Sequence, residues 1–234
     1  MYSSLKKKNL ILGGSSDISK ELIKNLDLKK NCLFLHYNKN KPKISNKQIT
    51  LIKKNFALLD GKNFSESLKI FKNFDIIINL IGYIDNKSYF KSNYNNLLKS
   101  LNANFLAPLF IIKNSINHMK KKKFGRIINC SSIGTKFGGG DNTYNYSLSK
   151  HCSDFIPKEL RKISNKNILI NNVKIGLVNT KIHKKIPKKR MSKRVQLIPA
   201  KRMSNSKEIT KLLMFLINEN SYISSETINI SGGE

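Results

Sequence analysis

Few cysteines and the absence of any long apolar run set the first limits on this sequence. Cys32, Cys130 and Cys152 are odd in number and widely spaced, which excludes a disulfide framework. The four histidines show no ligand spacing relative to these cysteines, so we expect no metal site. The longest apolar runs lie at 75–84 and 106–112. Both are well short of the roughly 20 residues that a membrane-spanning helix needs, so we expect no membrane association.

The amino-terminal residues lack the features of a targeting segment. Lysines at positions 6–8 lead directly into an apolar run and then into glycines, with no apolar signal region and no cleavage site. This pattern favours a mature cytoplasmic protein. A length of 234 residues suits one full-sized core and is short for two, so we expect a single domain over 1–234.

Acidic residues are scarce relative to basic ones. The chain has 44 Lys and Arg against 14 Asp and Glu, a formal net charge of +30, and such a field favours anionic partners. The excess is nearly all lysine, however, and accompanies abundant Asn and Ile along the whole chain, as A/T-rich codon bias would produce. The basic runs at 120–123 and 184–194 lack the interleaved aromatic residues of a single-strand-binding surface. Nucleic-acid binding is therefore not expected.

Short apolar runs alternate with longer amphipathic ones along the chain. This alternation predicts an α/β fold, a parallel sheet of about seven strands with helices on both faces. The segment 38–48 reads as a loop, and 176–204 as an irregular, mobile flap over the substrate. The predicted strands are 9–12, 32–37, 49–53, 75–80, 126–130, 168–175 and 227–230, and the predicted helices are 17–28, 64–71, 94–119, 145–164 and 206–217.

A glycine turn follows the first predicted strand and leads into a helix. The stretch reads Gly13-Gly14-Ser15-Ser16-Asp17-Ile18. Glycines let a backbone turn sharply and approach a pyrophosphate, and the helix N-terminus offers N–H groups to the anion. In this place, after the first strand of an alternating pattern, the turn predicts a dinucleotide site.

The end of the second predicted strand bears on which dinucleotide binds. A site for NAD usually places a carboxylate there, against the ribose 2′-hydroxyl. This chain has Asn38 and Lys39 instead, which suit a 2′-phosphate. The sequence therefore favours NADP(H) over NAD(H).

Tyr146 and Lys150 are spaced four residues apart on one face of a predicted helix. A nearby cation stabilises a phenolate, which suits a tyrosine that exchanges a proton with a carbonyl oxygen. The same spacing occurs at Tyr2, Tyr37 and Tyr83, so context must decide. Only Tyr146 follows a strand that ends in Ser132 and a glycine-containing loop, where open α/β sheets place their ligands.

With these motifs in hand, the chain resembles short-chain dehydrogenases/reductases, which have a single Rossmann-like domain, over nearly all of its length. The family's Thr-Gly-x-x-x-Gly-x-Gly turn corresponds to 12–19, with Gly13 kept and the later glycines replaced by Asp17 and Ser19. Asp17 would either repel the pyrophosphate or cap the helix. Further matches are the family's Asn-Asn-Ala-Gly at 79–82, its helix asparagine at Asn104, its Pro-Gly segment at 175–180, and its catalytic Ser, Tyr and Lys at Ser132, Tyr146 and Lys150.

The resemblance implies a role for each matching residue. Tyr146 is the general acid/base, Lys150 lowers its pKa and binds the nicotinamide ribose, Ser132 orients the substrate oxygen, and Asn104 holds a water that links Lys150 to solvent. Besides Tyr146, Lys150, Asn38 and Lys39, the implied cofactor contacts are Gly13, Ser15, Ser16, Ile18, Asn55, Phe56, Asn79, Gly82, Val178 and Thr180.

The resemblance also implies an activity and partners. The expected reaction interconverts a ketone and a secondary alcohol. The chain is similar to 3-oxoacyl-[acyl-carrier-protein] reductases. This similarity implies that Arg126 and Lys166 of this chain meet the acidic carrier. A sugar or polyol oxidoreductase of surface-polysaccharide synthesis, or a non-catalytic dinucleotide-binding regulator, stays open. In the family, the helices that match 94–119 and 145–164 pair across subunits, which implies a homodimer or homotetramer.

Overall fold

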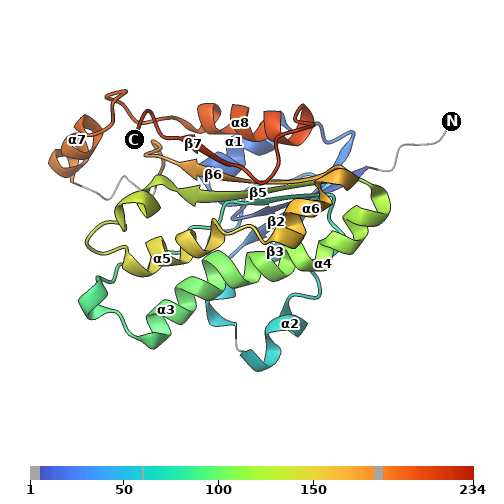
Figure 1. The fold of residues 1–234 in the computed structure, drawn as a ribbon, viewed down its shortest axis with the longest axis horizontal. Coiled ribbons are helices and arrows are strands. Elements are labelled where there is room, and N and C mark those ends of the chain that lie inside the picture. The colour runs from blue at the N-terminus through green and yellow to red at the C-terminus, as the bar shows by residue number, and fades with distance from the viewer. Residues whose placement is uncertain (1–5, 60, 182–186) are drawn as a thin grey trace.

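The computed structural model describes residues 6–59, 61–181 and 187–234. Within these residues seven parallel strands form one sheet in the order β3-β2-β1-β4-β5-β6-β7. Helices α1 (Asp17–Asn25) and α8 (Ser206–Asn218) cover one face, and α3 (Tyr94–Leu101), α4 (Ala107–Lys122) and α5 (Tyr144–Ser153) cover the other (Figure 1). This confirms the predicted fold class. The strands are β1 (Lys7–Leu12), β2 (Asn31–Tyr37), β3 (Ile49–Lys53), β4 (Ile76–Asn79), β5 (Gly125–Ser132), β6 (Ile168–Ile175) and β7 (Thr227–Ile230).

The central strands are buried on both faces. Successive side chains of a strand point to opposite sides of the sheet. In β4, Ile77 packs into the core on the α4 side, whereas Ile76 and Ile78 pack into the core on the α1 and α8 side. A run of consecutive isoleucines is therefore what a doubly covered parallel strand requires.

Helices α1 and α8 begin where a side chain satisfies a free backbone N–H group. Ser16 caps α1 by accepting from the N–H of Ser19, and Asn205 caps α8 in a capping box with Glu208, as N-terminal caps generally do. The helices are α1 (Asp17–Asn25), α2 (Phe64–Ser67), α3 (Tyr94–Leu101), α4 (Ala107–Lys122), α5 (Tyr144–Ser153), α6 (Lys158–Lys162), α7 (Lys188–Gln196) and α8 (Ser206–Asn218).

The long helix predicted at 94–119 is present, with an irregularity in its middle. A π-helical turn, Asn102–Leu106, joins α3 to α4. Pro108 is the second residue of α4, and proline has no N–H to offer the carbonyl of the residue four positions earlier, here Asn104. The N–H of Ala107 bonds instead to the carbonyl of Asn102, five residues back. The predicted site residue Asn104 thus sits on a turn of altered geometry.

The single helix predicted at 145–164 is wrong. Helix α5 ends at Ser153, and a separate short helix, α6, begins only at Lys158. The break precedes Pro157, whose ring disfavours helical geometry at the residue before it and whose nitrogen cannot donate. Phe155 lies in this break with 73% of its surface exposed. The helix predicted at 64–71 is likewise shorter, ending at Ser67.

The flap predicted as irregular at 176–204 contains a helix, α7. Its two ends meet where Val178 pairs with Ser204 in an isolated bridge. Residues 182–186 of this segment lie outside the described residues. The loop predicted at 38–48 is confirmed, since no helix or strand forms there. Among the described residues, none of the helices has both the length and the apolar character to cross a membrane.

Candidate active site

The predicted site residues gather at one edge of the sheet. Gly13 follows β1, Asn79 ends β4, Ser132 ends β5 and Val178 follows β6. Parallel strands present their carboxyl ends at a common edge, and β1 and β4 lie where the strand order reverses, the usual ligand position in such sheets. Figure 1 shows this edge at the left of the sheet, with α5 and α7 beside it.

Gly13 forms the tight turn after β1. Its φ of +81° is a left-handed conformation, and a Cβ there would lie 2.8 Å from the carbonyl oxygen of Leu80. Glycine is thus required both for the backbone angle and for the close approach to the end of β4. The tight turn predicted from the sequence therefore exists directly after β1.

The N-terminus of α1 has backbone N–H groups available for an anion. The N–H of Ser16 donates to the carbonyl of Gly13, and the Ser16 hydroxyl accepts from Ser19. Among the described residues no acceptor meets the N–H groups of Ser15, Asp17 or Ile18. Such N–H groups and the helix dipole suit a pyrophosphate. The turn thus fits the dinucleotide that the sequence predicts.

Asp17 and Ser19, which replace two glycines of the family turn, take up specific positions. The helix cap is Ser16, so Asp17 is the first helical residue and not the cap. The Asp17 carboxylate accepts a 2.8 Å hydrogen bond from the N–H of Lys181. Ser19 is fully buried, and its hydroxyl has no partner among the described residues.

The residues predicted for the adenosine end lie after β2 and β3. The Asn38 amide donates to Oδ1 of Asn55 over 3.3 Å, and Lys39 is exposed. The Phe56 side chain is buried and stacks on His36, so it belongs to the core and only its backbone borders this end. Asn79, at the end of β4, keeps a buried Nδ2 that has no acceptor within the described structure.

Tyr146 faces Ser132 and Gly82 at the carboxyl edge. Burial raises the pKa of the Tyr146 phenol, and a hydrogen bond with the Ser132 hydroxyl acts in the opposite direction. A Cβ on Gly82 would lie 3.9 Å from Cε2 of Tyr146, so the glycine leaves room beside the phenol ring. The Ser132 hydroxyl also accepts from the N–H of Gly134 over 3.1 Å. The tyrosine and serine predicted as a pair are brought together.

Lys150 lies one helical turn beyond Tyr146 on α5 and is 2% exposed. Its Nζ donates to the carbonyls of Ile81 and Cys130, each over 2.6 Å. Desolvation lowers the pKa of Lys150 to about 8. Lys150 is not among the groups that shift the pKa of the Tyr146 phenol, so the lowering expected from Lys150 stays a prediction.

Asn104 uses its whole side-chain amide to connect two segments. Its Oδ1 accepts from the N–H of Tyr83 over 2.8 Å, and its Nδ2 donates to the carbonyl of Tyr83 and to the hydroxyl of Ser149, both over 2.9 Å. It thereby ties the segment after β4 to α5. The sequence alone did not single out Ser149. Only its contact with Asn104 shows that it helps to hold this candidate site residue.

The residues after β6 complete the edge. Val178 is buried and Thr180 is half-buried, with its hydroxyl donating to the Val178 carbonyl over 3.4 Å. A Cβ on Gly176 would lie 2.7 Å from Cα of Ser231. The glycine therefore permits β6 to leave the sheet close to the end of β7.

The expectation that Arg126 meets a partner is wrong. Its guanidinium donates to the carbonyls of Gly125, Asn167 and Asn220, and the residue is 6% exposed. It lies at the amino end of β5, opposite the candidate site. Lys166, by contrast, is exposed.

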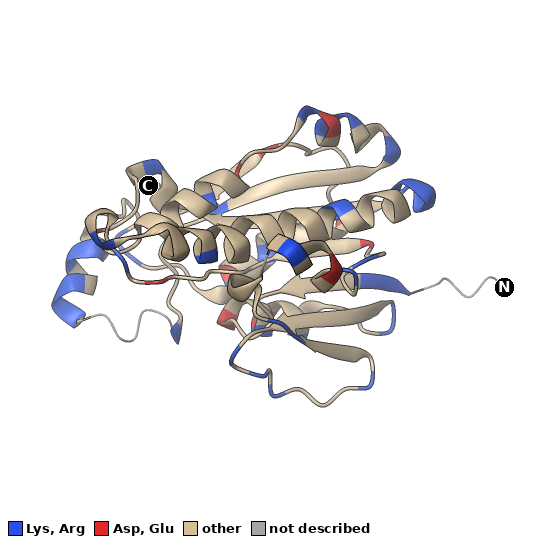
Figure 2. Cartoon of the chain, turned by 90° about the horizontal axis from the view of Figure 1, so that it is seen from below, with Lys and Arg blue, Asp and Glu red and all other residues tan. Residues whose placement is uncertain are grey.

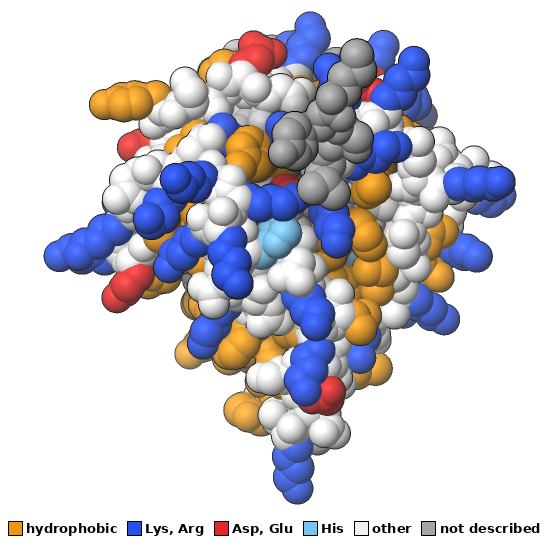
Figure 3. Space-filling model, turned by 90° about the vertical axis from the view of Figure 1, so that its right-hand side faces the viewer, with side chains coloured by type: hydrophobic (Ala, Val, Ile, Leu, Met, Phe, Trp, Pro, Cys, Tyr) orange, Lys and Arg blue, Asp and Glu red, His pale blue; other side chains and the backbone are white. Residues whose placement is uncertain are grey.

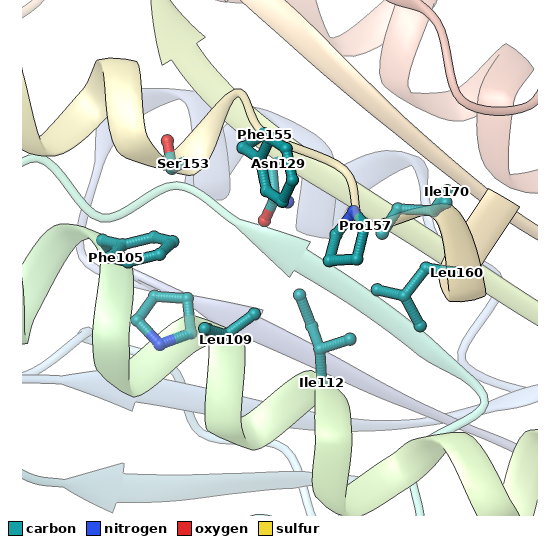
Figure 4. Close-up of a pocket in the computed structure, with 10 residues that line it drawn as sticks. Phe105, Leu109, Ile112, Asn129, Ser153, Phe155, Pro157, Leu160 and Ile170 are labelled. Atoms are coloured by element: carbon teal, nitrogen blue, oxygen red, sulfur yellow. The ribbon is translucent and has the colours of Figure 1, made fainter.

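A small pocket between α4 and the α5–α6 break is separate from this site (Figure 4). Its cavity of about 20 Å³ is lined by apolar side chains over Asn129 of β5. That volume suits one water molecule. None of the predicted catalytic residues borders it, so it is not the substrate site.

Known proteins resemble the chain in both sequence and fold. A family model described as enoyl-(acyl carrier protein) reductase matches residues 62–234. A 3-oxoacyl-[acyl-carrier-protein] reductase of Buchnera aphidicola subsp. Baizongia pistaciae is 33% identical over 184 residues, which cover 75% of each chain. The enzyme of that description from Aquifex aeolicus is 29% identical over 74% of this chain and 70% of its own length.

Solved structures share the fold at lower identity. A 3-oxoacyl (acyl-carrier-protein) reductase from Agrobacterium tumefaciens with NADP bound superimposes with a TM-score of 0.80 at 18% identity, covering 99% of this chain and 95% of its own. An NADPH-dependent reductase involved in bacilysin biosynthesis gives 0.79 at 20% identity, covering 97% and 98%.

Proposed function

Because the chain belongs to the short-chain dehydrogenase/reductase family, we propose that it reduces a 3-oxoacyl group on acyl carrier protein, with NADPH as cofactor. The family assignment makes the chain a nicotinamide-dependent oxidoreductase. The substrate proposal draws on the relatives' activity. The observation that carries the site is the pairing of the Tyr146 phenol with the Ser132 hydroxyl beside the space left by Gly82.

Tyr146 is the proposed proton donor. The bound nicotinamide supplies the hydride for the keto carbon. As negative charge grows on the keto oxygen, Tyr146 transfers its phenolic proton to that oxygen and Ser132 donates a hydrogen bond to it. Burial raises the pKa of Tyr146, which keeps the phenol protonated at neutral pH, the state that a donor requires.

Lys150 and Asn104 are proposed to orient the cofactor and return the proton. Lys150 is already held by two carbonyls at the edge, and we assign it to the nicotinamide ribose hydroxyls. The Asn104 side chain is fully engaged. Pro108 has no N–H to donate to the backbone carbonyl of Asn104. We therefore propose that this carbonyl binds the water that connects Lys150 with solvent.

The preference for NADPH is proposed from the end of β2. No carboxylate occupies this position, and Asn38 and exposed Lys39 follow the strand. A cationic and an amide side chain suit a 2′-phosphate. The N–H groups of Ser15 and Ile18 would receive the pyrophosphate. Val178 and Thr180 would border the nicotinamide carboxamide.

The organisation of the whole chain is also a proposal. We assign residues 1–234 to one dinucleotide-binding domain whose flap at about 176–204 borders the substrate. We assign it to a homodimer or homotetramer, for which exposed Phe155 and the pocket beside α4 offer an apolar surface. Size-exclusion chromatography with light scattering would test this, and a monomer at all concentrations would refute it.

Basic side chains around the site suit an acidic carrier. Helix α7 carries lysines and arginines at the site edge (Figure 2). Similar side chains also cover the opposite end of the molecule (Figure 3), so charge alone does not define a docking surface.

The function is tested by NADPH oxidation with a 3-oxoacyl group on acyl carrier protein. Tyr146→Phe should lower the rate at least about a hundredfold, the usual minimum for removing a general acid. Tyr144→Phe is the matched control, since Tyr144 lies on the same helix and packs against Tyr89; it should retain the rate. Equal activity of wild type and Tyr146→Phe would refute the mechanism. Turnover confined to sugars or polyols would refute the substrate.

A further inference from the structure

His36 accepts hydrogen bonds from two consecutive N–H groups of the glycine turn. The N–H of Gly13 points to Nδ1 of the His36 ring over 3.4 Å. The N–H of Gly14 donates to the backbone carbonyl of His36 over 2.7 Å. One residue near the end of β2 therefore holds both glycines, although it lies 23 positions beyond Gly13 and 22 beyond Gly14 in the chain.

The other side of the His36 ring faces the segment after β3. Its Nε2 lies 2.9 Å from the carbonyl oxygen of Lys54. The ring stacks on Phe56, with centroids 4.2 Å apart and planes 10° from parallel. Phe71 meets it edge-on. Since the Lys54 carbonyl can only accept, this pattern assigns the proton to Nε2 and leaves Nδ1 free to accept from Gly13.

The surroundings keep this arrangement neutral. His36 is 4% exposed, and burial lowers its pKa to about 4, against the opposing effect of the hydrogen bond that the ring donates to the Lys54 carbonyl. At neutral pH the ring therefore has one donor and one acceptor, and both are used. A protonated ring would lose its acceptor for Gly13.

We propose that His36 is a positioning residue for the dinucleotide. Its contact with Gly13 fixes the pyrophosphate turn, and its contacts with Lys54 and Phe56 hold the ring itself in place. By engaging the N–H groups of Gly13 and Gly14, it leaves those of Ser15, Asp17 and Ile18 to face the phosphates. The inference rests on the proposed placement of the dinucleotide over this turn.

Three substitutions separate the contacts of the ring. In His36→Asn, Oδ1 stands near the place of Nδ1 and can accept from Gly13. In His36→Gln, Nε2 stands near the place of the ring Nε2 and can donate to Lys54. His36→Phe keeps the stacking on Phe56 without either hydrogen bond. The proposal makes the Gly13 contact the one that matters for the cofactor.

Isothermal titration calorimetry with NADPH measures the effect. We expect His36→Gln and His36→Phe to weaken NADPH binding about fivefold, the value of one hydrogen bond. His36→Asn should stay within about twofold of wild type. With the 3-oxoacyl substrate, the KM for NADPH should rise in His36→Gln and His36→Phe, while kcat at saturating NADPH should stay at the wild-type value.

His118→Asn is the matched control, because His118 contacts Asp75 at the opposite end of the sheet. It should leave NADPH binding unchanged, which separates a general loss of stability from loss of positioning. Failure of wild type to bind NADPH would refute the proposed function itself. Wild-type binding with equal affinity in His36→Asn and His36→Gln, or a loss confined to kcat, would overturn the role of His36. The comparison of these two polar variants decides the question even if His36→Phe does not fold.

Discussion

The carboxylate of Asp17 accepts a 2.8 Å hydrogen bond from the backbone N–H of Lys181. This contact joins the first turn of α1 to the residue directly after Thr180, 164 positions away in the chain. Because the N–H groups beside Asp17 are those proposed to receive the pyrophosphate, the same side chain brings a negative charge close to the phosphates. Asp17 thus connects the flap to the turn. Its carboxylate also pairs with Lys20 over 3.5 Å, and we expect its charge to oppose the anion.

Removing only the charge of Asp17 should strengthen NADPH binding. Asp17→Asn retains an oxygen that can accept from Lys181 and removes the repulsion, so we expect about a threefold lower Kd at low salt. The gain should shrink as salt screens the charges. Fluorescence titration at two ionic strengths measures it. Asp27→Asn, the same change of charge at an exposed position beyond the end of α1, should have no effect. An unchanged or weaker affinity in Asp17→Asn would contradict the prediction.

Lys39 should distinguish NADPH from NADH. Losing one cationic contact to the 2′-phosphate in Lys39→Ala should raise the KM for NADPH about threefold to tenfold. The KM for NADH should stay constant, because NADH has no phosphate there. Steady-state kinetics with both cofactors gives the two values. Lys41→Ala, two residues further along the same exposed loop, serves as the control. An equal rise for both cofactors would show that Lys39 does not read the phosphate.

The burial of His36 should make stability depend on pH. Its folded pKa is about 4, below the ordinary value of 6.5, so between these values the unfolded chain binds the proton and the folded chain does not. The free energy of unfolding should therefore fall as pH decreases from about 6.5 to 4, by about 3 kcal/mol.

Urea unfolding of wild type and His36→Asn at about pH 7, 5.5 and 4.5, one value above and two within the titration range, would reveal this contribution. It appears as a difference in the slope of the free energy of unfolding against pH. His36→Asn should lose much of the slope. His151→Asn changes an exposed histidine and should retain it. Parallel wild-type and His36→Asn curves would show that His36 does not cause the dependence.

Arg126 should contribute to stability and not to carrier binding. Its guanidinium satisfies three backbone carbonyls in a buried position, so Arg126→Ala should cost about 3 kcal/mol. Urea unfolding measures the loss. Lys166→Ala, at an exposed lysine, should leave stability unchanged within about 0.5 kcal/mol. A stable Arg126→Ala protein with a raised KM for the carrier would reverse this assignment.

Local patterns predicted most of the sheet. The bounds of β3, β6 and β7 coincide with the predicted ranges, and the other strands differ by a few residues at their ends. Continuous apolar runs carry this signal because a doubly covered strand needs apolar side chains in both directions. The prediction of one helix at 145–164 was wrong because the apolar periodicity continues through Pro157, whereas the backbone of proline interrupts a helix regardless of that pattern.

The candidate site was only partly predictable. Gly13, Ser132, Tyr146 and Lys150 lie in motifs whose spacing can be read along the chain. Contacts between distant segments cannot be read in this way, since no local pattern pairs Asp17 with Lys181 or Asn104 with Ser149. For Arg126 the sequence motif was misleading. The motif predicted a surface residue, whereas in the structure its guanidinium is buried and donates to three backbone carbonyls.

The order of apolar runs, glycines and prolines along the chain determined an alternating parallel sheet with a turn for phosphate after its first strand, because backbone geometry and side-chain periodicity act locally. Only the tertiary structure decided which groups meet at the carboxyl edge and which of them lose water. Hydrogen bonding and desolvation depend on neighbours from distant parts of the chain. That is why the neutral His36 ring with its two hydrogen bonds and the raised pKa of Tyr146 became visible only in the folded protein.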